Sequence, residues 1–120
     1  MSINLAISAA SVLYGKKAQD INLLDVSAMT IITDYMIIAS GRSVIQVRTL
    51  SDEIERYFAA ESVLPRRIEG YREGRWIIMD YNHFILHLFH QEERAFYHLE
   101  RLWDNGTNQV LLPFADTDNP

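Results

Sequence analysis

The sequence has no cysteine and no long apolar run, and both absences restrict what the protein can be. Without cysteine, disulfides, zinc–thiolate sites and cysteine nucleophiles are excluded. No apolar stretch approaches the roughly 20 residues that cross a membrane. Lys16 and Lys17 follow the first apolar stretch instead of preceding it, unlike the layout of a secretory signal peptide. These features predict a cytoplasmic protein with no membrane partner.

Basic residues are also scarce. The chain has 11 Lys and Arg against 16 Asp and Glu, for a formal net charge of −5. Proteins that bind nucleic acid rely on basic side chains to displace counterions from phosphate. Sequence-specific binding to DNA or RNA is therefore not expected, and an acidic domain is better suited to a basic protein surface.

What the chain does contain is the pattern of one α/β domain. Its 120 residues suffice for a single core. Ser43 and Gln46 fit a capping box at the start of the second of three expected helices. The helices are expected over residues 2–15, 44–61 and 91–103, and the strands over 20–26, 34–39, 67–71, 76–81 and 84–89. This order predicts a mixed sheet of about five strands flanked by helices.

The centre of the expected sheet is the pair of strands 76–81 and 84–89, joined by a short turn at Asn82-His83. Neither run alternates between polar and apolar residues, so both faces are expected to be covered. The last helix is expected to place Ala95, Phe96, Leu99, Leu102 and Trp103 on its inner face. Residues 1–104 form the predicted domain, and 105–120 a flexible tail in which 110–112 can still pack against the body.

The four histidines do not predict a metal site. His83 and His87 are four residues apart, which in a strand means about 13 Å, too far for one shared ion. His90 falls on the opposite face of that strand, and no third ligand is available. Hydrogen-bonded structural histidines are favoured, and neither a metal nor a cofactor is expected.

An enzymatic function remains the alternative. Gly41-Arg42-Ser43 could hold an anion at a helix start, but it lacks the spacing of a phosphate-binding loop, and a strand-to-helix turn is favoured. Asp34 and Asp80 could meet across the sheet as a catalytic pair, although each also fits a turn. A nucleotide-binding or phosphoryl- or nucleotidyl-transfer enzyme would use Asp34, Gly41 and Asp80.

Three motifs in a fixed order resemble those of the ribosomal silencing factor family, also called the Iojap family. The first is the run DYMIIASGRS at 34–43, followed by Gln46-Val47. The second is Glu69-Gly70, Gly74-x-Trp76 and Asp80-Tyr81. The third is His87-x-Phe89, Glu92-x-Arg94-x-x-Tyr97-x-Leu99-Glu100-x-Leu102-Trp103. The resemblance covers residues 3–104.

The resemblance implies a non-enzymatic translational repressor. Such a factor binds the large ribosomal subunit through the basic ribosomal protein conventionally numbered fourteen. It thereby sterically blocks subunit joining and lowers translation when nutrients are short; organellar relatives are linked to large-subunit assembly. The resemblance also implies a nucleotidyltransferase-like fold and a possible homodimer. The paired carboxylates of nucleotidyltransferases, spaced D-x-[DE], are missing here, so the likeness of fold does not imply their activity.

A contact patch is expected where one strand ends and the last helix starts. Large aromatic and charged side chains dominate binding hot spots. The residues expected to form this partner-binding patch are Trp76, Asp80, Tyr81, Glu92, Arg94 and Tyr97. A dimeric adaptor unrelated to ribosomes is a third reading of the same residues, and it predicts homodimers without ribosome binding.

Overall fold

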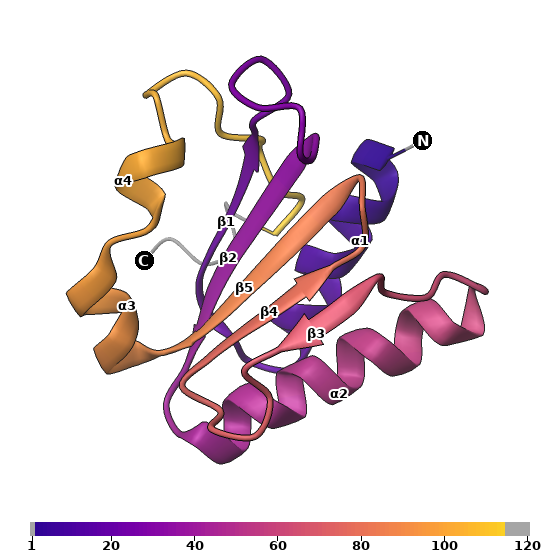
Figure 1. The fold of residues 1–120 in the computed structure, drawn as a ribbon, viewed down its shortest axis with the longest axis vertical. Coiled ribbons are helices and arrows are strands. Elements are labelled where there is room, and N and C mark those ends of the chain that lie inside the picture. Colours follow the sequence, from indigo (N-terminus) through magenta and orange to yellow (C-terminus); the bar gives the residue numbers. More distant parts are fainter. Residues whose placement is uncertain (1, 115–120) are drawn as a thin grey trace.

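The computed structural model describes residues 2–114, which form one α/β domain around a five-stranded sheet (Figure 1). The helices are α1 (Ser2–Gly15), α2 (Val44–Ala60), α3 (Gln91–Tyr97) and α4 (Glu100–Trp103). The strands are β1 (Gln19–Asp25), β2 (Tyr35–Gly41), β3 (Arg67–Glu69), β4 (Trp76–Asp80) and β5 (Phe84–His90). The strand order is β1-β2-β5-β4-β3. The predicted fold class is confirmed.

The two central strands, β2 and β5, are the only parallel pair that the described residues form. Tyr35 lies beside Phe84 and Gly41 beside His90, whereas the other three pairs are antiparallel. Six of the seven residues in each of these strands are buried. This burial explains why their sequences show a continuous apolar run instead of an alternating pattern.

Helices α1 and α2 cover one face of the sheet, which we call the closed face. The core there is formed by alternate strand residues, such as Ile37, Leu86 and Ile77, packed against apolar helix residues. The helix residues are Ala6, Ala9, Ala10 and Leu13 of α1 and Val47, Leu50, Ile54 and Phe58 of α2. Small alanines let α1 lie close to the strands.

The start of α2 depends on a tight turn. Ser43 Oγ accepts a hydrogen bond from the Gln46 backbone N–H at 3.0 Å, which confirms the predicted cap. The Gln46 side chain reaches back to the Arg42 backbone N–H at 2.6 Å. A Cβ atom at Gly41 would lie 3.0 Å from Val47 Cγ2, so glycine allows the strand and helix to approach each other.

The opposite face, which we call the open face, is only partly covered. Helices α3 and α4 lie beside β1 and β2, and in the view of Figure 1 no helix passes in front of β5, β4 or β3. Under α3 and α4 is a second, smaller core of Leu24, Val26, Met36, Ile38 and Phe89. Trp76, Leu99 and Trp103 pack against this core and are partly buried.

The predicted last helix is interrupted, which corrects the prediction of one helix over 91–103. His98 adopts a left-handed conformation with φ of 51°, and its N–H closes α3 on the carbonyl of Arg94 at 3.0 Å. Phe96 of α3 is 78% exposed and Leu102 of α4 is 72% exposed. The expectation that Ala95, Phe96 and Leu102 face inward was wrong, and Arg94 is the buried residue of α3.

The chain after α4 continues along the outer edge of β1. The Val110 N–H donates to the Leu23 carbonyl at 2.8 Å, and the Asn108 side chain donates to the Asp25 carbonyl at 3.0 Å. Leu112 is buried, as the expected packing of 110–112 requires. The flexible tail predicted to run to residue 120 lies, from residue 115 on, outside the described residues. Within residues 2–114, no helix is long and apolar enough to cross a membrane.

Candidate interaction surface

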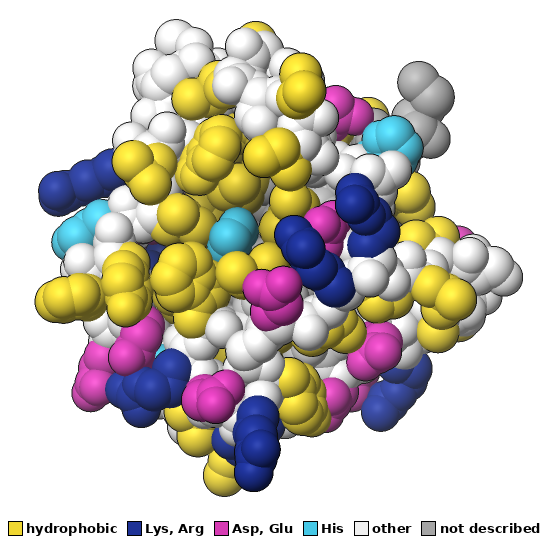
Figure 2. All heavy atoms as spheres, viewed as in Figure 1, with side chains coloured by type: hydrophobic (Ala, Val, Ile, Leu, Met, Phe, Trp, Pro, Cys, Tyr) yellow, Lys and Arg dark blue, Asp and Glu magenta, His cyan; other side chains and the backbone are white. Residues whose placement is uncertain are grey.

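The uncovered part of the open face is formed by alternate residues of β4 and β5. Strand register places Trp76, Ile78 and Asp80 beside Phe89, His87 and Ile85. Figure 2 shows hydrophobic side chains gathered in the centre and left of this side of the molecule, with a histidine among them. Charged side chains of both signs adjoin this apolar area, to its right and below it. An apolar centre with a charged rim is the usual anatomy of a protein–protein interface.

Trp76 is the largest side chain of this surface and is held on several sides. Its ring stacks on Phe89 at a centroid distance of 4.8 Å and contacts Tyr97 of α3 at 5.1 Å. The indole Nε1–H donates to His87 Nδ1 at 3.1 Å. Tyr97 is about half exposed. The three rings form a partly exposed aromatic cluster whose orientation is fixed before any partner arrives.

His87 lies in the middle of this surface and is nearly buried, with an exposed fraction of 8%. Burial lowers the pKa of its imidazole from 6.5 to about 4, because a charged ring would lose its hydration. The centre of the open face is therefore uncharged at neutral pH. The sequence predicted a hydrogen-bonded structural histidine here, and the bond to Trp76 confirms it.

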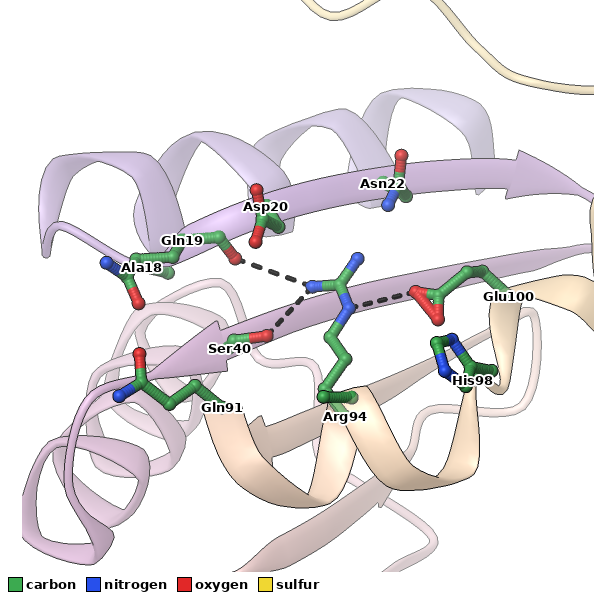
Figure 3. A pocket seen from close by; sticks show the side chains of 10 residues that line it. Ala18, Gln19, Asp20, Asn22, Ser40, Gln91, Arg94, His98 and Glu100 are labelled. Carbon is green, nitrogen blue, oxygen red and sulfur yellow. Dashed lines mark hydrogen bonds and ion pairs between the residues drawn. The ribbon is translucent and has the colours of Figure 1, made fainter.

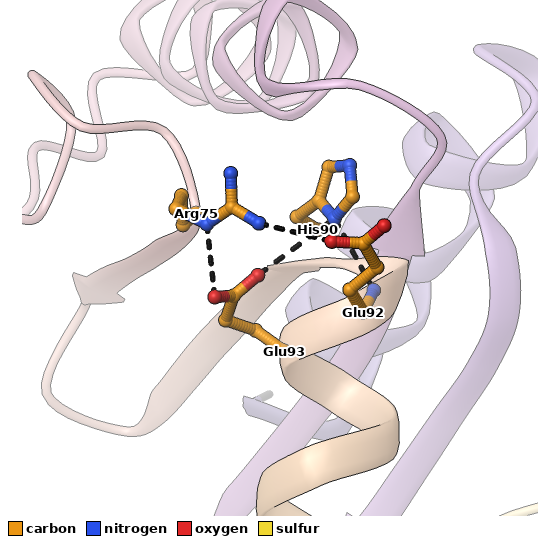
Figure 4. Close-up of polar contacts among 4 residues, drawn as sticks. All are labelled: Arg75, His90, Glu92 and Glu93. Carbon is orange, nitrogen blue, oxygen red and sulfur yellow. Dashed lines mark hydrogen bonds and ion pairs between the residues drawn. The ribbon is translucent and has the colours of Figure 1, made fainter.

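An ion-paired cluster stands where β5 leads into α3 (Figure 4). Arg75 Nε donates to Glu93 Oε2 at 2.8 Å, and its Nη2 donates to Glu92 Oε1 at 3.2 Å. Hydrogen bonding to Arg75 lowers the pKa of the Glu93 carboxyl. Two carboxylates face one guanidinium, so the cluster keeps an excess negative charge, and Glu92 is 73% exposed at its side chain.

The same cluster contains ligand types that a metal could use. Ligand atoms of His90, Glu92 and Glu93 all lie within 4.8 Å of one another. However, His90 Nδ1 already accepts the Glu92 backbone N–H at 3.2 Å, and Arg75 bonds both carboxylates. The positive guanidinium occupies the position in which a cation would be attracted. The arrangement favours an ion-pair network over a metal centre.

Arg94 lies in a cavity of about 760 Å³ between α3 and β1 (Figure 3). Its guanidinium points across β2, where Nη1 donates to Ser40 Oγ at 3.0 Å and to the Gln19 carbonyl at 3.5 Å. Its Nε donates to Glu100 Oε2 of α4 at 2.9 Å. Arg94 thus connects both short helices to two strands. This geometry is that of a structural anchor.

The six residues of the predicted contact patch lie in four places instead of one. Trp76, Tyr97 and Glu92 lie at or beside the aromatic cluster. Asp80 is at the other end of β4, about 13 Å from Trp76 along the strand. Arg94 is buried beneath α3, and Tyr81 belongs to the closed-face core. The expectation that all six cluster at one strand end was wrong.

Asp80 and Tyr81 have clear structural surroundings. Asp80 Oδ1 accepts the Asn82 backbone N–H at 2.8 Å and so holds the β4–β5 turn, in which Asn82 has φ of 77°. Tyr81 packs against Phe58 and Phe84 at centroid distances of 5.1 and 5.0 Å. Burial raises the pKa of the Tyr81 hydroxyl to about 12, and this hydroxyl has no hydrogen-bond partner in the described part of the chain.

The carboxylates of the enzymatic alternative do not converge. Strand β5 separates Asp34, just before β2, from Asp80 on β4, so the two are about two strand spacings or 10 Å apart. Asp34 Oδ2 lies 3.5 Å from His83 Nδ1, and Asp80 Oδ1 accepts the backbone N–H of Asn82 in the β4–β5 turn. Gly41 is explained by its contact with Val47. This arrangement offers no pair of acids around a common pocket.

Sequence reasoning missed two residues of this surface. His87 was assigned no role in binding, although the turn at 82–83 already fixes the register that pairs it with Ile78 and makes Trp76 its diagonal neighbour on the same face. Arg75 was not singled out, because an arginine before a strand gives no local signal that it will reach two glutamates of a later helix.

Comparison with known proteins gives consistent results. The family model described as "Ribosomal silencing factor during starvation" matches residues 1–119. The "Ribosomal silencing factor RsfS" of Bacillus subtilis is 34% identical over 110 residues, which cover 92% of this chain and 88% of that protein. "Protein Iojap, chloroplastic" of Arabidopsis thaliana is 30% identical over 120 residues, and the match spans 99% of this chain and 49% of that protein.

Two crystal structures have the same fold. A protein from Bacillus halodurans superposes with a TM-score of 0.76 at 31% identity, covering 92% of this chain and 96% of that one. A protein from Chromobacterium violaceum superposes with a TM-score of 0.84 at 26% identity, covering 94% of this chain and 96% of that one.

Proposed function

The chain belongs to the family of ribosomal silencing factors, and from this premise we propose that it silences ribosomes by binding the large subunit and blocking subunit joining. The partner on the subunit would be the basic ribosomal protein conventionally numbered fourteen. The role is steric and needs no catalysis. It requires the protein to be where ribosomes are, in the cytoplasm.

The observation that carries this proposal is the aromatic cluster on the uncovered half of the sheet. Trp76 stacks on Phe89, contacts the tilted ring of Tyr97 and donates a hydrogen bond to His87, so little conformational freedom is lost when a partner covers it. Preorganised Trp and Tyr side chains are the residue types that dominate binding energy at protein interfaces. The open face supplies such an anchor without unfolding any element.

Charge supports a basic partner. The cluster of Arg75, Glu92 and Glu93 beside the aromatic residues has one more negative than positive charge, and the chain as a whole carries −5. An acidic rim accelerates encounter with a positively charged surface and opposes docking on an acidic one. Binding should therefore weaken as salt concentration rises.

The size of the domain suits a steric mechanism. Its principal extents are 35 × 33 × 27 Å, so a copy docked by the open face adds a rigid layer almost 30 Å thick to the subunit. A layer of that thickness on the joining surface would hold the two subunits apart, because their contacts require direct apposition.

Sucrose-gradient sedimentation with separated ribosomal subunits tests the proposal. The wild-type protein should migrate with the large subunit alone and reduce the yield of joined ribosomes. Trp76→Ala and Glu92→Arg should weaken co-migration. Ile45→Ala, at a 70% exposed position on α2 across the sheet, is the matched control and should behave as wild type. Absence of the wild-type protein from the large-subunit fraction at low salt would refute the proposal.

A further inference from the structure

The open face carries a polar atom whose hydrogen bond is not made within the protein. His87 has two ring nitrogens, and Nδ1 accepts the Trp76 indole N–H at 3.1 Å. An indole nitrogen only donates, so Nδ1 must be unprotonated. A neutral imidazole then carries its hydrogen on Nε2. Trp76 therefore fixes the tautomer of His87 as well as the orientation of its ring.

The Nε2–H group has no acceptor among residues 2–114, yet it is not sealed inside. The buried polar atoms that lack a partner in the described chain are Ser51 Oγ, Tyr81 Oη and Glu93 Oε1, and His87 Nε2 is not one of them. The Nε2 atom is therefore in contact with solvent, although His87 as a whole is only 8% exposed. The ring's neighbours along the strand register are apolar: Ile78 on β4 and Ile38 on β2.

Water satisfies such a donor in the free protein, but a docked partner displaces that water. A buried N–H left without an acceptor weakens binding by more than a hydrogen bond to it strengthens binding. A site with one positioned donor in an apolar surface consequently rejects partners that lack an acceptor at that point. The low pKa of the ring supports this role, because a neutral donor neither attracts nor repels a basic partner.

We propose that His87 is a specificity-determining residue of the open face and that its Nε2–H donates to an oxygen of the docked ribosomal protein. This inference rests on the proposed function, since it names the contact that the same surface makes. The acceptor is an oxygen on an apolar part of the partner's surface, in the manner of an unpaired backbone carbonyl. Trp76 acts on this contact twice, as an anchor and as the residue that positions His87.

The tautomer can be tested without ribosomes. Long-range ¹⁵N–¹H correlation spectra of the folded protein at neutral pH should show His87 protonated on Nε2. In Trp76→Phe, which keeps a stacking ring but removes the donor, both tautomers should be populated. Protonation of Nδ1 in the wild type would overturn the inference, because the bond from Trp76 would then not exist.

Binding is tested with a pair of matched variants. In His87→Gln the side-chain amide nitrogen reaches about as far as Nε2 and keeps a donor, whereas His87→Met fills similar volume without one. We expect His87→Met to weaken large-subunit binding by about tenfold and His87→Gln by no more than about threefold. Thermal midpoints of both variants are measured first to establish that each is folded.

The outcomes separate this inference from the proposed function. If the wild type does not bind the large subunit, the proposed function fails whatever the tautomer. If the wild type binds and His87→Met binds equally well, the function stands and the role of His87 is refuted. Equal loss in both folded variants would also refute it, because the donor would then not be the property that matters.

Discussion

The two faces of the sheet share five strands but differ in how their polar side chains are held. The closed face is covered by two long helices and is almost entirely apolar, yet it encloses two hydroxyls without partners in the described chain, Ser51 Oγ and Tyr81 Oη. The open face contains His87, Asp80 and Ser40, and each of them makes a hydrogen bond within the protein.

This difference separates a face that serves stability from the face that we propose for recognition. Burial of apolar area is the main source of folding free energy, and the closed face supplies most of it. The polar groups of the open face are held by specific bonds, which fixes their geometry but contributes less to the free energy of unfolding. Four substitutions or conditions test this division, beginning with the largest expected effect.

Phe58→Ala, on the closed face, should lower the free energy of unfolding more than any of the other changes. Phe58 is fully buried and contacts the rings of Tyr81 and Phe84 at 5.1 and 5.2 Å, so its loss leaves a cavity. The free energy of unfolding, measured by urea denaturation, should fall by about 3–5 kcal/mol. Phe96→Ala, at an exposed site, should change it by less than about 0.5 kcal/mol. Similar losses in both variants would show that burial does not distinguish them.

Lowering the pH should reduce the free energy of unfolding through His87 on the open face. The pKa of His87 is about 4 in the folded protein, against the ordinary value of 6.5 that we take for the unfolded chain. Between pH 6.5 and about 4, the unfolded chain therefore binds a proton at this residue that the folded chain does not bind. The free energy of unfolding should fall as pH drops from 6.5 toward 4, by about 3 kcal/mol when complete. Comparison with His87→Gln isolates this contribution from the carboxyl groups, and parallel pH profiles for the two proteins would contradict it.

Arg94→Met tests the anchor beneath the short helices. The substitution leaves Glu100 and Ser40 without their partner, and because the pair is partly exposed we expect a loss of about 1–3 kcal/mol. Hydrogen exchange should increase mainly in α3 and α4. A double-mutant cycle with Glu100→Gln should give a coupling energy above about 0.5 kcal/mol, and additive effects would show that the two residues act separately.

Tyr81→Phe is expected to have the smallest effect and the opposite sign. It removes a buried hydroxyl that has no partner among the described residues while keeping the ring stacked on Phe84. The free energy of unfolding should stay the same or rise by up to about 1 kcal/mol. Large-subunit binding should be unchanged. A clear loss of stability would mean that the hydroxyl is hydrogen-bonded, most simply to a buried water.

Much of the fold could be predicted because local signals and hydrophobic patterns agree. The capping pair Ser43 and Gln46 marks α2, and continuous apolar runs mark β2 and β5 as central strands. The break at His98 had no such signal, because a left-handed histidine is selected by the surroundings and not by its own preference. Arg94 was expected at the surface for a similar reason, since its partners Ser40 and Glu100 come from separate elements.

For the candidate site, the sequence predicted the types of residue better than their positions in the fold. Aromatic and acidic residues near residue 76 and in the last helix indicated a binding surface, and Trp76, Tyr97 and Glu92 do lie together. Asp80 and Tyr81 were grouped with them on sequence proximity, whereas alternation along β4 sends Trp76 and Tyr81 to opposite faces. The direct role of Trp76, Tyr97 and Glu92 in binding stays a prediction.

The parallel pairing of β2 with β5 also has a consequence for how the protein is made. Tyr35 and Phe84 are neighbours in the sheet but 49 positions apart in the chain (84 minus 35), so the centre of the sheet closes only after a long loop has been ordered. During synthesis β2 can pair with β1, but its second neighbour in the sheet is missing until β5 has left the ribosome. A nascent copy thus completes its open face only after β5 has emerged, because residues of β4 and β5 form the uncovered part of that face.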